Sequence, residues 1–136
     1  MICLLAASVV VPLGLPAITL RWTHSVEKIT WEEDWAETPA GLTMTASRVR
    51  GSGAGMDPAP DARWVDGAWT WVPHVAPLRE VVLRRSGATA DWSVCLRGAC
   101  KPMSDYVGPQ ADPVRLAPCA DGPRGGADAP PGPRSG

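Results

Sequence analysis

Short runs of alternating apolar and polar residues, separated by turn residues, constrain the fold more than any other feature of this sequence. In the run RWVDGAWTWV, residues 63–72, the Asp-Gly pair at 66–67 is a strong type I′ turn signal between two tryptophan-bearing segments. The segment AITLRWTHS places Ile18, Leu20 and Trp22 on one face of a strand. Further segments of this kind predict about eight short strands, at the spacing of a single small antiparallel sandwich or barrel.

Proline and glycine favour the same all-β class. The chain of 136 residues contains 15 Pro and 14 Gly, too many for a helical bundle, because Pro lacks a backbone donor and Gly is costly inside helices. The length suffices for one domain with a modest core. The formal net charge of -1 gives no field that would attract nucleic acid or an anionic membrane surface.

The first 17 residues, MICLLAASVVVPLGLPA, are apolar and carry no charged side chain. They are too short for a comfortable spanning helix, which needs about 20 apolar residues, and Pro12 and Pro16 interrupt them. The segment is typical of a secretory signal peptide or an N-terminal anchor, although a basic start is missing. The alternative is a buried N-terminal strand. We predict that residues 18–119 form the folded domain and that the Pro/Gly-rich tail, residues 120–136, is disordered.

The cysteines agree with an exported chain. In DWSVCLRGACKPM, the Arg-Gly pair at 97–98 can form a two-residue turn, which makes Cys95 and Cys100 a cross-strand pair within disulfide reach. We predict this disulfide, with Cys119 free or exchanging as an alternative partner. A zinc site is disfavoured because the three cysteines lack CxxC spacing and a nearby histidine. The expected location is the periplasm or the cell surface, with membrane association only through the N-terminal segment.

The segment RWTHSVEKITWEEDW, residues 21–35, is the first candidate for chemistry. Its His24, Glu27 and Glu32 could hold a divalent metal, but their spacing matches no metal motif. The simpler interpretation is a hairpin whose acids lie on the solvent face, at an exposed or irregular end. His24 and Ser25 cannot form a catalytic dyad, because adjacent strand residues point to opposite faces. We recognise no catalytic constellation and expect no cofactor.

The segment GSGAGMD, residues 51–57, is the second candidate. Its alternating glycines resemble a phosphate loop, but no GK[ST] follows and no βαβ unit surrounds them. A loop of small residues can present successive backbone N–H groups to a carboxylate or another anion. It can equally be an ordinary long connection between strands. The seven tryptophans of this Phe-free chain are predicted to lie mostly in the core, and any exposed ones would form a docking surface.

Three blocks, WTHSVEKITWEEDW, GSGAGMD and DWSVCLRGACKPM, followed by a terminal LAPC, resemble domain-of-unknown-function family 1850. The resemblance covers the chain from about Leu20 to Cys119 and follows the family's order of blocks. Members of this family are small exported bacterial proteins, typically encoded beside TAXI-type TRAP transporters. The resemblance implies an accessory role in tripartite solute uptake, with no catalytic activity established for the family. The positions within its motif blocks are His24, Ser25, Glu27, Glu32, Glu33, Gly51, Gly53, Gly55, Met56, Cys95, Cys100 and Cys119.

Three hypotheses about function follow. The first is an extracytoplasmic accessory protein of a TAXI-type TRAP system, which binds a permease or solute-binding subunit, or a small carboxylate. In this hypothesis the two candidate segments converge on one face, and the binding residues are His24, Ser25, Glu27, Glu32, Glu33, Gly51, Gly53, Gly55 and Met56. The second is a metal-binding protein or metal-dependent enzyme centred on His24, Glu27 and Glu32. The third is a purely structural interaction module whose acids serve solubility.

Overall fold

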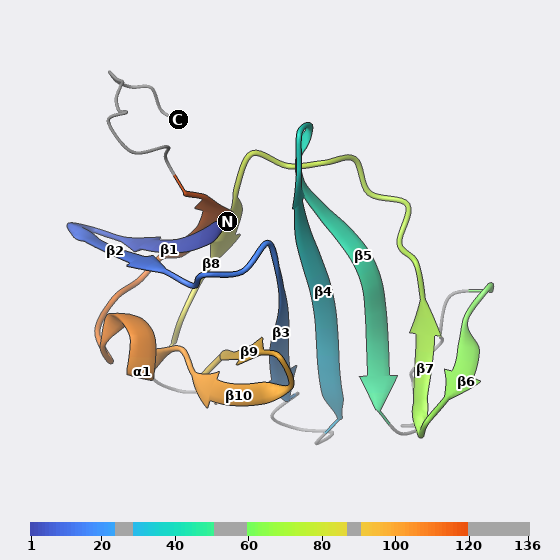
Figure 1. The fold of residues 1–136 in the computed structure, drawn as a ribbon. Helices are drawn as coiled ribbons and strands as arrows, with labels where there is room; N and C mark the ends of the chain where they lie inside the picture. Colours follow the sequence, from blue (N-terminus) through green and yellow to red (C-terminus); the bar gives the residue numbers. More distant parts are fainter. Residues whose placement is uncertain (24–28, 51–59, 87–90, 120–136) are drawn as a thin grey trace.

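Two antiparallel sheets make up the protein in the computed structural model, which describes residues 1–23, 29–50, 60–86 and 91–119 (Figure 1). The smaller sheet has the strand order β2-β1-β11-β8, and the larger sheet has the order β10-β9-β3-β4-β5-β7-β6. The sheets form a sandwich that does not close into a barrel. The predicted all-β class is therefore confirmed, with 11 strands in the described residues, more than the sequence predicted.

The larger sheet is built around three long strands that follow one another along the chain and pair as neighbours. Its members are β3 (Ala17–Thr23), β4 (Thr30–Thr38), β5 (Gly41–Arg50), β6 (Arg63–Val65), β7 (Ala68–Trp71), β9 (Ser93–Leu96) and β10 (Ala99–Pro102). Both predicted two-residue turns are present. Asp66 and Gly67 join β6 to β7 with φ of 50° and 80°, and Arg97 and Gly98 join β9 to β10 with φ of 54° and 85°. Positive φ at both turn residues matches the twist of the flanking strands.

The smaller sheet contains the N-terminal segment. Its strands are β1 (Ile2–Ala6), β2 (Val9–Pro12), β8 (Val81–Leu83) and β11 (Val114–Pro118). β1 pairs with β2 on one side and with β11 on the other, and Ile2 and Leu4 are fully buried. The first 17 residues thus take the form of the buried strand alternative, where a leader or anchor was expected. Ile2–Ala6 and Val9–Pro12, which lie before the predicted domain of residues 18–119, are thus part of the sandwich.

The main core lies between the smaller sheet and the β9, β3 and β4 part of the larger sheet. Leu4 and Leu116 reach it from the smaller sheet, and Leu20 and Trp35 reach it from the larger sheet. Among the described residues, this core includes none from β6 or β7. These two strands therefore extend the larger sheet beyond the smaller one (Figure 1). We call the face of the larger sheet that carries Leu20 and Trp35 the inner face, and the opposite face the outer face.

Two disulfides pair all four cysteines. Cys95 and Cys100 are joined between β9 and β10, as predicted. Cys119, which was predicted to be free or an alternative partner, is instead bonded to Cys3. The sequence analysis missed this pair because it assigned Cys3 to a leader. The two disulfides indicate an oxidising, extracytoplasmic environment.

The only helix in the described ranges is α1 (Ser104–Val107), which begins just after β10. It occupies the stretch CKPMSDYVG, where the sequence allowed one short turn. No helix in these ranges is long and apolar enough to cross a membrane.

Candidate functional site

The structure describes only two of the nine residues that were expected to bind a ligand together. Seven of the nine lie outside the described residues, namely His24, Ser25, Glu27, Gly51, Gly53, Gly55 and Met56. The other two, Glu32 and Glu33, are adjacent on β4, so their side chains point to opposite faces of the sheet. Glu32 pairs with Arg21 across the outer face, and Glu33 pairs with Leu20 across the inner face. These two acids therefore cannot belong to one binding face.

The two motif segments nevertheless attach to the larger sheet at the same end. Residues 24–28 connect Thr23 to β4, and residues 51–59 begin after Arg50. Thr30 pairs with Thr23 on one side and with Arg50 on the other. The segments thus leave neighbouring positions of the sheet, as their expected convergence requires.

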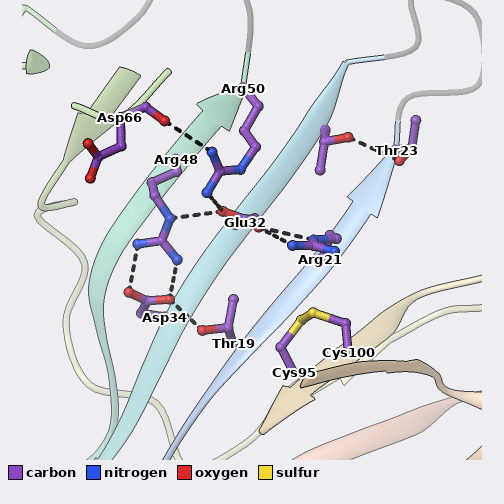
Figure 2. Close-up of polar contacts among 11 residues, drawn as sticks. Thr19, Arg21, Thr23, Glu32, Asp34, Arg48, Arg50, Asp66, Cys95 and Cys100 are labelled. Atoms are coloured by element: carbon purple, nitrogen blue, oxygen red, sulfur yellow. Dashed lines mark hydrogen bonds and ion pairs between the residues drawn. A yellow bond between two sulfur atoms is a disulfide. The ribbon is translucent and has the colours of Figure 1, made fainter. Parts of the chain in front are cut away.

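Glu32 lies between three arginines, Arg21, Arg48 and Arg50, on the outer face (Figure 2). Arg21 donates from Nη2 and Nε to one carboxylate oxygen, at 2.8 and 3.0 Å, and Arg48 Nε donates to the other oxygen at 2.9 Å. Arg50 Nη2 lies 3.3 Å from the oxygen that Arg48 contacts. The residue is only 3% exposed. The prediction that the acids of β4 mark an exposed or irregular end is thus wrong for Glu32, because guanidinium groups replace water around its carboxylate.

Asp34, two residues further along β4, extends this network. Arg48 donates from Nη1 and Nη2 to its two oxygens at 2.8 and 2.6 Å, and Thr19 Oγ1 donates at 2.6 Å. Burial alone would raise the pKa of Glu32, but hydrogen bonds from Arg48 and Arg21 outweigh burial and lower it. The pKa of Asp34 is lowered in the same way, by Arg48 and Thr19 against burial. Both acids are therefore ionised at neutral pH.

Positive charge is in excess within this network, which holds three guanidinium groups and two carboxylates. All three guanidinium nitrogens of Arg48 bond to Glu32 or Asp34. The side chains of Arg50 and Arg21 are 44% and 39% exposed. Arg50 makes only long contacts with described residues, at 3.3 Å to Glu32 and 3.4 Å to the carbonyl oxygen of Asp66. The surplus charge thus lies on Arg50 and Arg21, beside the attachment points of the two motif segments.

Sequence reasoning did not single out these arginines. The alternation in SRVR places Arg48 and Arg50 on one face of β5, which was a usable signal. Their pairing with Glu32 depends on the cross-strand register, and an irregularity shifts that register between Asp34 and Trp35. Such a shift leaves no clear mark in one sequence, so the network could not be assembled from it.

Six tryptophans lie on or against the inner face outside the buried core, and Trp92 packs against that core. We call this set the tryptophan face: Trp22, Trp31, Trp64, Trp69, Trp71 and Trp92. Trp22 and Trp31 are cross-strand partners whose ring planes are stacked, with centroids 5.9 Å apart, and Trp71 meets Trp31 edge-on at 6.4 Å. Trp64 is 53% exposed, and Trp35 is the one tryptophan buried in the core. The prediction that most tryptophans lie in the core is therefore wrong.

Glu33 lies where the core meets the tryptophan face. Its cross-strand partners are Leu20, which is buried in the core, and Ser47. Trp35 Nε1 donates a hydrogen bond to its carboxylate at 3.1 Å. Burial raises the pKa of Glu33, and the bond from Trp35 offsets only part of that effect. No cation from the described residues forms an ion pair with this carboxylate.

Of the three expected metal ligands, only Glu32 lies within the described residues. The described residues contain no group of three or more His, Cys, Asp and Glu side chains that could hold a metal. Both carboxylate oxygens of Glu32 accept bonds from arginines, so a metal there would have to displace guanidinium groups. His24 and Glu27, the other two expected ligands, lie outside the described residues.

A family model described as "Domain of unknown function (DUF1850)" matches residues 18–103. This range contains the arginine network, the tryptophan face and the Cys95–Cys100 hairpin. No curated protein and no solved structure matches the chain.

Proposed function

The chain belongs to the DUF1850 family, whose model covers residues 18–103, and we propose that it is an extracytoplasmic accessory protein that binds a small carboxylate. The binding position is the end of the larger sheet formed by Arg50 and Arg21. The observation that carries this proposal is the surplus of guanidinium groups beside the attachment points of both motif segments. The setting is the periplasm or the cell surface, with residues 1–17 kept inside the folded domain.

Arg50 is the residue best suited to contact the anion. A guanidinium group binds a carboxylate through two parallel N–H bonds, which requires free and accessible donors. Arg50 fulfils this condition because its contacts with described residues are long and its side chain is partly exposed. Arg48 does not, because its three nitrogens already hold the two acids.

Thr23 and Thr30 add hydroxyl groups at the same place. Their Oγ1 atoms lie 3.3 Å apart, and Thr30 is the cross-strand partner of Arg50. Either hydroxyl can turn to donate to an anion, because a hydroxyl hydrogen rotates freely. The proposed site therefore combines one charged group with neutral donors.

The uptake system that we propose for this protein is of the TAXI-type TRAP class, which the family resemblance implies. Its permease or solute-binding subunit is the expected protein partner. A pull-down from native membranes with tagged protein tests this part, and recovery of either subunit supports it. Recovery of neither, from membranes shown to contain both, contradicts it.

Titration calorimetry with acetate, malonate and succinate tests the binding site. We expect saturable binding to the wild-type protein and, in Arg50→Gln, a dissociation constant raised by about tenfold, the loss expected for one charge-assisted contact. Arg97→Gln is the matched control, because Arg97 lies in the exposed turn of the β9–β10 hairpin. Equal affinity of both variants, or no saturable binding by the wild type, contradicts the proposal.

Glu32→Ala is a poor test of this function, although the sequence analysis expected Glu32 to be a binding residue. The substitution removes the buried partner of three arginines, so a loss of activity could reflect a loss of folding. Elemental analysis of protein purified without chelators addresses the metal alternative. A stoichiometric metal would overturn the proposal in favour of a metal site.

A further inference from the structure

Glu33 differs from the other acids of β4 in having no positive partner among the described residues. Glu32 and Asp34 are held by arginines, and Glu37 contacts the N-terminal amine. From the part of the chain that the structure describes, Glu33 receives one neutral hydrogen bond, donated by Trp35. A half-buried carboxylate that has no counter-ion destabilises the folded protein, and a cation that binds beside it is attracted by a charge that no other cation neutralises.

The surroundings of Glu33 are aromatic. Trp31 precedes it by two residues on the same face of β4, and Trp22 is the cross-strand partner of Trp31. Trp71 lies in the same row as Glu33, with only the small side chain of Ser47 between them. Trp22 is diagonal to Glu33 on the neighbouring strand, a position within reach of a large ring, and Trp71 joins the group through its edge-on contact with Trp31 at 6.4 Å. Indole rings carry negative charge on their faces and therefore attract cations.

The unpaired carboxylate and the neighbouring indole rings both attract the same kind of ligand, an organic cation. We propose that Glu33, with the indoles of Trp22, Trp31 and Trp71, forms a binding site for a small organic ammonium ion. A bare metal ion does not fit, because a hard cation needs several oxygen ligands and indoles supply none. An anion does not fit either, because Glu33 repels it. An alkylammonium ion places its charge beside the carboxylate and its methyl or methylene groups against the rings.

This site is independent of the carboxylate site. Glu33 points to the inner face and the arginine network lies on the outer face, so the sheet itself separates them. Loss of one site leaves the residues of the other untouched. A negative result in the acetate titration therefore says nothing about the ammonium site, and the reverse also holds.

Tetramethylammonium chloride is the probe, and the indole N–H signals in a ¹H–¹⁵N spectrum are the readout. The Trp35 Nε1–H donates to Glu33, so its signal reports directly on events at that carboxylate. We expect a saturable shift of this signal with a dissociation constant of about 1 mM, as befits so small a ligand. Neopentyl alcohol, which is similar in shape but uncharged, is expected to give no saturable shift. Equal binding of the alcohol, or no saturable shift with the ammonium ion, overturns the proposal.

Three variants locate the site. Glu33→Gln removes the charge and keeps an oxygen that can accept the bond from Trp35, so the fold should survive. It is expected to weaken tetramethylammonium binding by about tenfold or more, and Trp31→Leu by about threefold to tenfold. Trp64→Leu is the matched control, because Trp64 lies on the edge strand β6 and contacts only Trp69 among the rings. Unchanged binding in Glu33→Gln, with melting temperatures showing that all variants fold, overturns the proposal.

Discussion

The Cys3–Cys119 disulfide should stabilise the protein far more than Cys95–Cys100. The first closes a loop with a sequence separation of 116 and the second a loop with a separation of 5. In the chain-entropy model, the cost of losing a disulfide grows with the logarithm of loop length. The double variant Cys3→Ala/Cys119→Ala should therefore lose about 5 kcal/mol, and Cys95→Ala/Cys100→Ala about 2 kcal/mol.

The loss of stability without the Cys3–Cys119 disulfide should affect β1 and β11, two strands that contribute to the core. Cys3 lies on β1, and the amide of Cys119 donates to the carbonyl of Met1 at 2.8 Å, so the disulfide fastens β1 to the end of β11. Folded domains are stable by about 5–15 kcal/mol in total. Removal of this disulfide should thus consume a third or more of the stability, and the protein would be marginally folded at room temperature.

Urea unfolding of the oxidised wild type and of both double variants measures the two losses. Alanine is preferred to serine because Cys3 is buried, and a serine hydroxyl there would lack a partner. Peptide mapping under non-reducing conditions checks the connectivity. The reasoning is refuted if the Cys3/Cys119 variant is no less stable than the Cys95/Cys100 variant, or if mapping links Cys119 to another cysteine.

Four further predictions concern the fold and its charges. Deletion of residues 1–17 removes β1 and β2 and should leave a chain without a cooperative unfolding transition, whereas a native-like near-UV circular dichroism spectrum would contradict the role of β1 in the core. Arg48→Ala should cost about 2–3 kcal/mol in urea unfolding, because it strips hydrogen bonds from both Glu32 and Asp34. Folding lowers the pKa values of Glu32 and Asp34, so the stability they contribute is complete above their unfolded pKa values and is lost as pH falls towards their folded pKa values. The free energy of unfolding of the wild type should therefore decrease on acidification, and the absence of such a decrease would contradict this prediction. Glu33→Gln should raise the melting temperature at neutral pH, because burial raises the folded pKa of Glu33 and disfavours its ionised form. This gain in melting temperature should shrink as pH falls through the folded pKa of Glu33. A lower melting temperature of the variant at pH 7 would refute this account.

Local features of the fold could be predicted from the sequence, and distant pairings could not. The Asp66-Gly67 turn and the Cys95–Cys100 pair each depend on a few adjacent residues, whose turn chemistry is visible in the chain. The place of β1 in the core depends on its pairing with β11 near the opposite end of the chain, and no local sequence pattern predicts that pairing. An apolar segment without its partner strand has the same appearance as a leader, so the sequence analysis assigned residues 1–17, with Cys3, to a leader and missed the Cys3–Cys119 pair.

The candidate site was predictable to a smaller extent. The alternation of strand residues separates Glu32 from Glu33, and that separation follows from the sequence once β4 is recognised. What the sequence lacks is the register that sets Arg21 and Arg48 opposite Glu32. An acid expected to face water is therefore buried, because its counter-ions come from strands that only the fold brings alongside.

The same alternation of side chains explains how β4 contributes acids to two chemically different surfaces, the arginine network on the outer face and the tryptophan face on the inner face. Glu32 and Asp34 attract arginines on the outer face, and the surplus charge there favours an anion. Glu33 lies between them in sequence, but the backbone of the sheet separates its carboxylate from those guanidinium groups. Its pKa rises while the pKa values of its neighbours fall, although the three residues are consecutive. Opposite shifts within three positions indicate two distinct environments, and the two proposed binding sites, one for an anion and one for a cation, depend on this difference.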